Sequence, residues 1–127
     1  MSKLIYLASP YGHDKPPELR QQRYEQAQKA EARMMNDGMM VYSPIVHRHP
    51  GAVLGLYPTG WEYWQHFDEL ILSRCDDLCV LRIEGWEESG GVKAEIEIAM
   101  RLGLRIYAYD PISDQVVSLF MESATDV

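Results

Sequence analysis

The chain has 127 residues, of which 46% are hydrophobic, and its 19 acidic and 12 basic residues give a net charge of −7. This length and composition predict one soluble globular domain, residues 1–127, with a sizeable core. The acidic balance argues against a nucleic acid polymer as partner, because such binding needs a basic face. No apolar run approaches the roughly 20 residues that span a bilayer, and the start of the chain lacks a signal-peptide cleavage pattern, so we expect a cytoplasmic protein without a membrane partner.

Strand and helix patterns alternate along the chain. Apolar, β-rich runs predict strands over residues 3–8, 39–42, 78–83 and 104–109. Helical spacing predicts helices over residues 16–36, 61–74, 92–102 and 113–121. Residues 45–60 are rich in His, Pro and Gly and are predicted to form a long irregular connection, which in a compact domain is usually functional or mobile. The alternation predicts an α/β fold, a flavodoxin-like doubly wound parallel sheet of strand order 2-1-3-4 with helices on both faces.

The segment SGGVKAEIEIA, residues 89–99, contains the strongest candidate for catalysis. It follows a predicted strand and opens a predicted helix. Glu95 therefore falls in the first helical turn, at the border of the buried face and at the sheet edge where α/β folds bind ligands. The positive end of the helix dipole favours an ionised Glu95 that attacks an electrophilic carbon. The alternative is a first-turn glutamate that serves only the helix dipole.

Asp68 and Tyr6 are the candidates nearest to Glu95 in the predicted fold. Asp68 lies on the helix before the third strand, and two carboxyl groups about 5 Å apart suit a retaining glycosyl transfer, in which one attacks and the other shuttles a proton. Tyr6 lies near the same sheet edge. A solvated position for Asp68 and a core position for Tyr6 are the alternatives. Four further aromatic residues either stack on a flat base or pack in the interior: Trp61, Tyr63, Trp64 and Trp86.

Sequence motifs for tight nucleotide or metal binding are absent. The chain has no G-x-G-x-x-G after the first strand and no G-x-x-x-x-G-K-[ST], and we predict no cofactor. His47 and His49 lack a carboxylate at the spacing of a zinc site, so no metal site is predicted, and we expect this histidine-rich loop to contact substrate or to be exposed. Cys75 and Cys79 match neither a zinc knuckle nor a redox pair and are expected to be buried thiols.

Three segments between residues 3 and 109 form a pattern known from one enzyme superfamily. They are YLASPY at residues 6–11, Asp68 followed by Asp76 and an apolar strand, and SGGVKAEI at residues 89–96. In order and spacing they resemble the "YLAGPF", "D…AD-V-V-V" and "S/D-x-G-V/T-x-x-E-I/L-G" segments of the nucleoside 2-deoxyribosyltransferase superfamily. The chain is most similar to the small DUF1937-type branch of that superfamily. Glu97 departs from the pattern, because the superfamily carries Gly at that position.

The resemblance implies a role for each matched residue. Glu95 matches the covalent nucleophile, Asp68 the acid that assists the leaving base, and Tyr6 the tyrosine that orients the nucleophile. The residue at position 89 separates two branches, because the transferases carry Asp there while the deoxynucleoside 5′-monophosphate glycosidases carry a Ser that helps to hold phosphate. Six residues complete the implied substrate site: Ser9, Tyr11, His47, Ser89, Gly90 and Gly91.

The implied function is cleavage or transfer of the N-glycosidic bond of a nucleoside or nucleoside 5′-monophosphate through a covalent glycosyl intermediate. A glycosidase that acts on the monophosphate needs local phosphate donors, such as Ser9, Ser89 and Lys15 or Arg20, whereas a transferase that acts on free nucleosides does not. A non-catalytic nucleotide-binding or sensing domain of the same fold stays open as an alternative. So does a phosphoribohydrolase of the cytokinin-activating type, whose Gly-Gly-x-Gly-Thr-x-x-Glu loop is matched here only in its first two glycines and its glutamate.

Apolar residues in the loop 45–60 and aromatic residues in the helix 61–74 predict self-association. Their exposure to water would be costly, so we expect them to cover the mouth of the site, a neighbouring subunit or both. The prediction is a homo-oligomer, a dimer or tetramer, with a two-fold interface that includes this helix. The alternative is that the aromatic side chains pack on the sheet.

Overall fold

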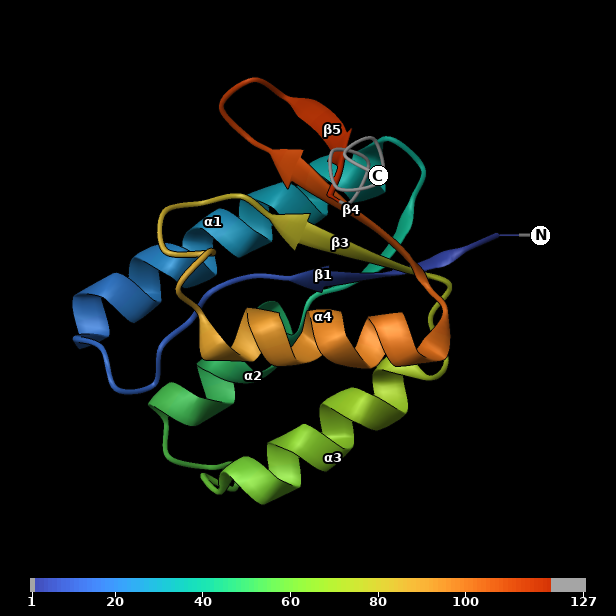
Figure 1. The fold of residues 1–127 in the computed structure, drawn as a ribbon. Helices are drawn as coiled ribbons and strands as arrows, with labels where there is room; N and C mark the ends of the chain where they lie inside the picture. The colour runs from blue at the N-terminus through green and yellow to red at the C-terminus, as the bar shows by residue number, and fades with distance from the viewer. Residues whose placement is uncertain (1, 120–127) are drawn as a thin grey trace.

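Five strands form one sheet in the order β2-β1-β3-β4-β5 in the computed structural model, which describes residues 2–119. The elements follow one another as β1 (Leu4–Ala8), α1 (Pro17–Asn36), β2 (Met40–Tyr42), α2 (Pro44–Val53), α3 (Trp61–Leu72), β3 (Asp77–Leu81), α4 (Gly90–Leu102), β4 (Arg105–Asp110) and β5 (Gln115–Ser118). The first four strands are parallel and β5 is antiparallel to β4 (Figure 1). The predicted α/β class and the order 2-1-3-4 are therefore confirmed, with β5 added at the edge.

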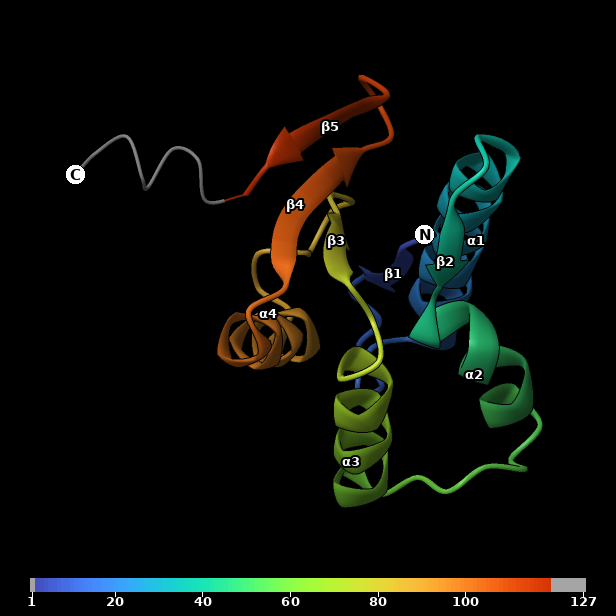
Figure 2. The same cartoon turned by 90° about the vertical axis from the view of Figure 1, so that its right-hand side faces the viewer.

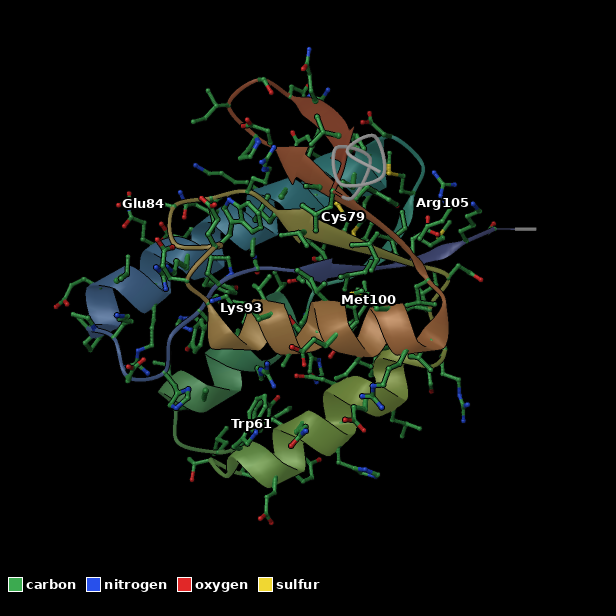
Figure 3. The ribbon with its side chains drawn as sticks, viewed as in Figure 1. Trp61, Cys79, Glu84, Lys93, Met100 and Arg105 are labelled. Carbon is green, nitrogen blue, oxygen red and sulfur yellow. The ribbon has the colours of Figure 1, made fainter. Side chains whose placement is uncertain are left out.

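Helices cover both faces of the sheet, as predicted (Figure 2). Side chains alternate along a strand, so Leu7 of β1 faces α1, where it joins Ala27 and Ala30 in one core cluster. Tyr6 and Ala8 face the opposite side, in a second core cluster with residues of α3 and α4. Cys79 of β3 is fully buried, as expected for a structural thiol, whereas Trp61 at the start of α3 is 52% exposed (Figure 3).

The segment 45–60 differs from the prediction, because its first part is the helix α2. The Ser43 hydroxyl caps this helix by accepting a hydrogen bond from Val46 N at 3.2 Å, and Pro44 occupies the first helical position, where the absence of its N–H costs nothing. Burial of Ile45 and His49 stabilises the helix although it contains Pro50. Only residues 54–60 form the irregular connection, between α2 and α3.

The predicted helix over residues 113–121 is also wrong for the residues that the structure describes. Residues 111–114 form a turn and β5 follows it. Asp114 adopts a φ of 57° in this turn and accepts a hydrogen bond from Tyr109 Oη at 2.6 Å. The β-branched pair Val116 and Val117 then favours a strand that pairs with β4. Residues 120 and 121 of the predicted helix lie outside the described residues.

Candidate functional site

Helix α4 carries Glu95 into the interior of the protein. The helix begins at Gly90, and the Ser89 hydroxyl caps it by accepting a hydrogen bond from Val92 N at 3.2 Å. Glu95 is therefore the sixth residue of the helix and lies in its second turn, which corrects the predicted first-turn position. Its side chain lies on the face that packs against the sheet, and the residue is only 7% exposed.

Tyr6 on the neighbouring strand holds the carboxyl group of Glu95. β1 lies between β2 and β3, and Tyr6 is fully buried. Its hydroxyl donates a hydrogen bond of 2.5 Å to Glu95 Oε2. A hydrogen bond of this length is typical of a hydroxyl that donates to a charged or proton-sharing carboxyl group. The bond fixes the position of the Glu95 carboxyl group against the sheet.

Asp68 of α3 lies in the same buried cluster and is 4% exposed. Arg48 of α2 donates from its guanidinium to Asp68 Oδ2 at 3.4 Å, and the side chain of Arg48 is only 18% exposed. The same guanidinium lies over the ring of Trp64, 4.6 Å from its centroid. The second oxygen of Asp68, Oδ1, is buried and has no hydrogen-bond partner within residues 2–119.

Burial changes the ionisation of both carboxyl groups. Desolvation and the charge of Asp68 raise the pKa of Glu95 to about 8, although Tyr6 and Arg48 act to lower it. Burial also raises the pKa of Asp68, and Arg48 opposes this increase through both its charge and its hydrogen bond. Burial thus opposes the ionised form of Glu95 that the helix dipole was expected to favour. The physical reason is that the dipole acts mainly within the first turn, whereas Glu95 lies in the second and is buried.

Aromatic rings extend from this cluster toward the surface. The ring of Tyr42 lies 5.8 Å from that of Tyr6, and His47 of α2 lies 5.9 Å from Tyr42. His47 also stacks on Phe67 of α3 at 5.9 Å and on Tyr57 at 6.4 Å. The structure thus brings the predicted substrate residue His47 to the aromatic side of the carboxyl cluster, where α2 and α3 meet.

Tyr11 lies apart from the carboxyl cluster, on the α1 side of the sheet. Its hydroxyl is 2.7 Å from Nδ1 of His49, whose Nε2 is 2.9 Å from Gln21 Oε1, and His49 stacks on Tyr24 at 4.5 Å. Burial, together with the charge of Arg20, lowers the pKa of His49. In this conformation Tyr11 and His49 therefore hold α2 against α1 and do not contact Glu95.

The remaining predicted residues lie at the start of α4 and at the end of β1. Gly90 and Gly91 are exposed, and a side chain at either position would meet no close neighbour. Ser89 is occupied as the helix cap. Ser9 directly follows β1, is 6% exposed, and its hydroxyl has no hydrogen-bond partner in the described part of the chain. Among the predicted phosphate donors, Ser9 Oγ and Arg20 Nε are thus both buried without a hydrogen-bond partner in this part of the chain.

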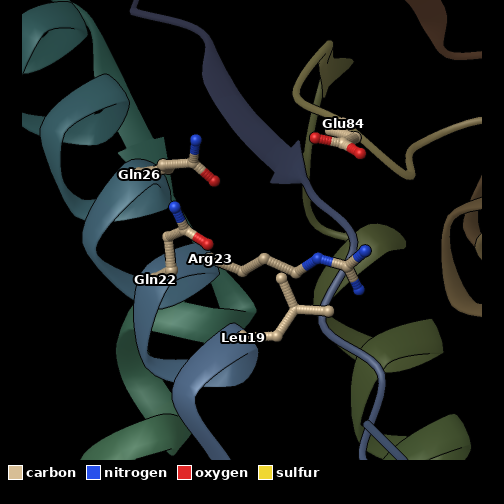
Figure 4. A pocket seen from close by; sticks show the side chains of 5 residues that line it. All are labelled: Leu19, Gln22, Arg23, Gln26 and Glu84. Atoms are coloured by element: carbon tan, nitrogen blue, oxygen red, sulfur yellow. The ribbon is translucent and has the colours of Figure 1, made fainter. Parts of the chain in front are cut away.

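Two surface hollows are present, and neither is lined by Tyr6, Asp68 or Glu95. One is lined by Glu62, Gln65, His66 and Glu69 of α3. The other, between α1 and the loop after β3, is lined by Leu19, Gln22, Arg23, Gln26 and Glu84 (Figure 4). Arg23 extends there from α1 and donates to the carbonyl oxygen of Tyr11 at 3.1 Å. The carboxyl pair itself is enclosed, so a substrate reaches it only after side chains move.

Arg48 is the residue of this cluster that sequence reasoning missed. The sequence around Arg48 was predicted to form an irregular connection, and such a segment has no periodic pattern that indicates which side chains point inward. A usable signal was present in Ser43-Pro44, a helix cap followed by the proline that favours a first helical turn. With a helix starting there, Arg48 and Ile45 fall on neighbouring positions of one face.

Within residues 2–119, no group of three or more His, Cys, Asp or Glu side chains is arranged to hold a metal ion. Among the helices of the same residues, none has the length and apolar character needed to cross a membrane.

A family model described as a domain of unknown function (DUF1937) matches residues 3–111, which include the entire carboxyl cluster. A search of curated proteins finds no match to the chain.

Proposed function

We propose that this chain, which belongs to the DUF1937 family, cleaves or transfers the N-glycosidic bond of a nucleoside or nucleoside 5′-monophosphate. The observation that carries the proposal is the 2.5 Å hydrogen bond from Tyr6 to Glu95 beside the second carboxyl group of Asp68. A tyrosine that orients one of two neighbouring carboxyl groups is the arrangement implied by the resemblance to the nucleoside 2-deoxyribosyltransferase superfamily. Retaining glycosyl transfer requires the same pair of groups.

In the proposed reaction the Glu95 carboxylate attacks the anomeric carbon of the sugar. The bond between that carbon and the base nitrogen breaks, its electron pair leaves with the base, and the Asp68 carboxyl group gives the base a proton. Charge develops on the sugar ring in the transition state, and the nearby carboxylate stabilises it. Water or a second base, deprotonated by Asp68, then attacks the anomeric carbon and releases Glu95.

Substrate access requires the connection between α2 and α3 to move. Tyr6, Asp68 and Glu95 are all less than 10% exposed, so a sugar cannot contact them in this conformation. Residues 54–60 are exposed and join α2 to α3. Displacement of this segment would open the surface between α2 and α3, where His47 and Phe67 could stack on the base.

Carboxyl variants test the chemistry. Glu95→Ala and Glu95→Gln should abolish release of base from a panel of nucleosides and monophosphates while the fold survives. Glu97→Gln is the matched control, since Glu97 lies two residues further on the same helix and is exposed. Unchanged turnover in either Glu95 variant refutes the assignment of the nucleophile.

The same panel separates a hydrolase from a transferase. Release of sugar phosphate from monophosphates alone favours a glycosidase, and base exchange on free nucleosides favours a transferase. The free hydroxyl of Ser9 and the open backbone at Gly90 and Gly91 support a phosphate site at this edge of the sheet. Ser9→Ala should then weaken turnover of monophosphates more than that of nucleosides.

A non-catalytic nucleotide-binding domain is the second candidate. The enclosed carboxyl pair and the raised pKa of Glu95 favour it, because both oppose nucleophilic attack in the free protein. Calorimetric binding of a nucleotide, without release of base over hours, supports this candidate. Detection of a glycosyl–Glu95 adduct by mass spectrometry excludes it.

We also propose that the protein is a homo-oligomer whose two-fold interface includes α3. Four apolar side chains at and before this helix support the proposal, since all are about half exposed or more: Leu54, Leu56, Trp61 and Tyr63. Exposed apolar patches of this kind mark interaction surfaces. Light scattering at micromolar concentration tests the assembly, and a clean monomer mass near 14.6 kDa contradicts it.

A further inference from the structure

Arg48 lies between the ring of Trp64 and the carboxyl group of Asp68, at the one place where α2 contacts the carboxyl cluster through a charged group. We infer that Arg48 is a positioning residue, which keeps Asp68 ionised in the free protein and thereby leaves the single proton of the carboxyl pair on Glu95. Its effect on catalysis rests on the proposed function, whereas its effect on the proton can be measured without any substrate.

The contacts of the two carboxyl groups are unequal. Asp68 faces a permanent cation, because a guanidinium stays protonated at all relevant pH values. Glu95 receives its hydrogen bond from Tyr6, a neutral hydroxyl. Two buried carboxyl groups close to each other do not both ionise readily, so the first proton leaves the group that has the cation. That group is Asp68.

The other titratable groups around the pair do not reverse this order. Tyr6 from β1 and Tyr42 from β2 both have pKa values raised by burial, so both stay neutral while the carboxyl groups titrate. The positive charge of Arg48 acts to lower the pKa of all four groups: Tyr6, Tyr42, Asp68 and Glu95. Within the described residues, however, its guanidinium donates a side-chain hydrogen bond only to Asp68. Because Asp68 contacts Arg48 directly, its ionised form is stabilised by this cation more than that of the other three groups.

This resting distribution is the opposite of what the proposed reaction requires. Attack needs an ionised Glu95 and a protonated Asp68. The pair holds one proton in both arrangements, so the change is a transfer of that proton from Glu95 to Asp68 with no net uptake. Arg48 belongs to the helix that precedes the exposed connection 54–60. A substrate that entered between α2 and α3 and drew Arg48 away from Asp68 would remove the cation and so favour transfer of the proton to Asp68.

Carboxyl titrations of the free protein test the inference. The protein is labelled with ¹³C at the side-chain carboxyl groups of Asp and Glu, and NMR follows Asp68 and Glu95 from pH 3 to pH 10, with Asp68→Asn and Glu95→Gln for assignment. In the unmodified protein Asp68 should ionise at lower pH than Glu95. Arg48→Gln should shift the ionisation of Asp68 to higher pH. Arg48→Lys should shift the ionisation of Asp68 much less, because the charge is retained.

Arg101→Gln is the matched control. Arg101 of α4 forms an ion pair at 3.8 Å with Glu69, which lies on the same helix as Asp68 but at the surface. This substitution should leave both titrations unchanged. The inference is overturned if Asp68 titrates identically with and without Arg48, or if Glu95 ionises before Asp68 in the unmodified protein. The order in which Asp68 and Glu95 ionise is measured without any Arg48 variant, so the inference can be refuted even if Arg48→Gln fails to fold.

These outcomes are separate from those of the proposed function. Absence of base release, with the titration of Asp68 still dependent on Arg48, refutes the proposed function and supports the electrostatic role of Arg48. If base release requires Glu95 but the titration of Asp68 does not depend on Arg48, the proposed function is supported and the electrostatic role of Arg48 is refuted.

Discussion

Glu95→Gln is predicted to make the protein more stable at neutral and alkaline pH. Glutamine has nearly the shape of the protonated glutamic acid and its amide oxygen can still accept the hydrogen bond from Tyr6. It cannot ionise. The substitution therefore removes the free-energy cost of placing a carboxylate in the interior, where Glu95 is 7% exposed.

The pKa of Glu95 fixes the size and the sign of the effect. Burial raises this pKa from 4.5 to about 8. Between these two pH values the unfolded chain releases the Glu95 proton while the folded protein keeps it, so the free energy of unfolding falls as pH rises. The fall is about 1.4 kcal/mol per pH unit, which gives about 3 kcal/mol by pH 7 and about 5 kcal/mol by pH 8. Below pH 4.5 the contribution of this group is fully present.

Urea unfolding of both proteins between pH 4.5 and pH 9 measures the difference. All other ionisable groups are shared, so subtraction isolates Glu95 together with its effect on the coupled carboxyl group of Asp68. The Gln variant should match the unmodified protein near pH 4.5 and exceed it increasingly up to about pH 8, above which the gap becomes constant. A gap that does not change with pH would show that the carboxyl group is ionised or solvated in the folded protein.

Three other predictions concern single residues. Tyr6→Phe removes the hydrogen bond that lowers the pKa of Glu95, so the fall in stability should extend to higher pH than in the unmodified protein, as followed by the same urea titrations. Ser89→Ala removes the cap of α4 and should cost about 1 kcal/mol of unfolding free energy at any pH, and a negligible cost would mean that another group caps the helix. Leu72→Ala creates a cavity beneath α3 at a fully buried position and should cost about 2–5 kcal/mol, whereas Leu70→Ala, at a half-exposed position of the same helix, should cost far less in thermal unfolding.

Regular periodicity explains why most of the fold could be predicted from the sequence. The apolar run of β3 is buried along its whole length, and the stripe of α4 that includes Val92 and Ala99 faces the sheet. Gly103 ends α4 with a φ of 74°, as its position after the stripe indicates. Such patterns depend on neighbours within one element, and the sequence records them directly.

The errors arose where distant contacts decide the structure. α2 contains two prolines and two histidines, and it is helical because Ile45 and His49 are buried against α1 and β1. β5 is a strand because the edge of β4 is available for pairing. The protonation of Glu95 depends on Asp68, 27 positions earlier in the chain, and on burial by the sheet. These contacts join residues that lie far apart in the sequence, so no local sequence pattern predicts them.

The antiparallel strand β5 has a consequence for how the sheet avoids joining other chains. The family match ends at residue 111, directly after β4, so β5 lies beyond the matched region. Without β5, the backbone N–H and C=O groups of residues 107–110 would stand open along an apolar, tyrosine-rich strand, the kind of edge that recruits a strand from another molecule. β5 pairs with those groups, and the outer edge of the sheet is then β5 itself, a strand of four residues, Gln115–Ser118, where β4 has six.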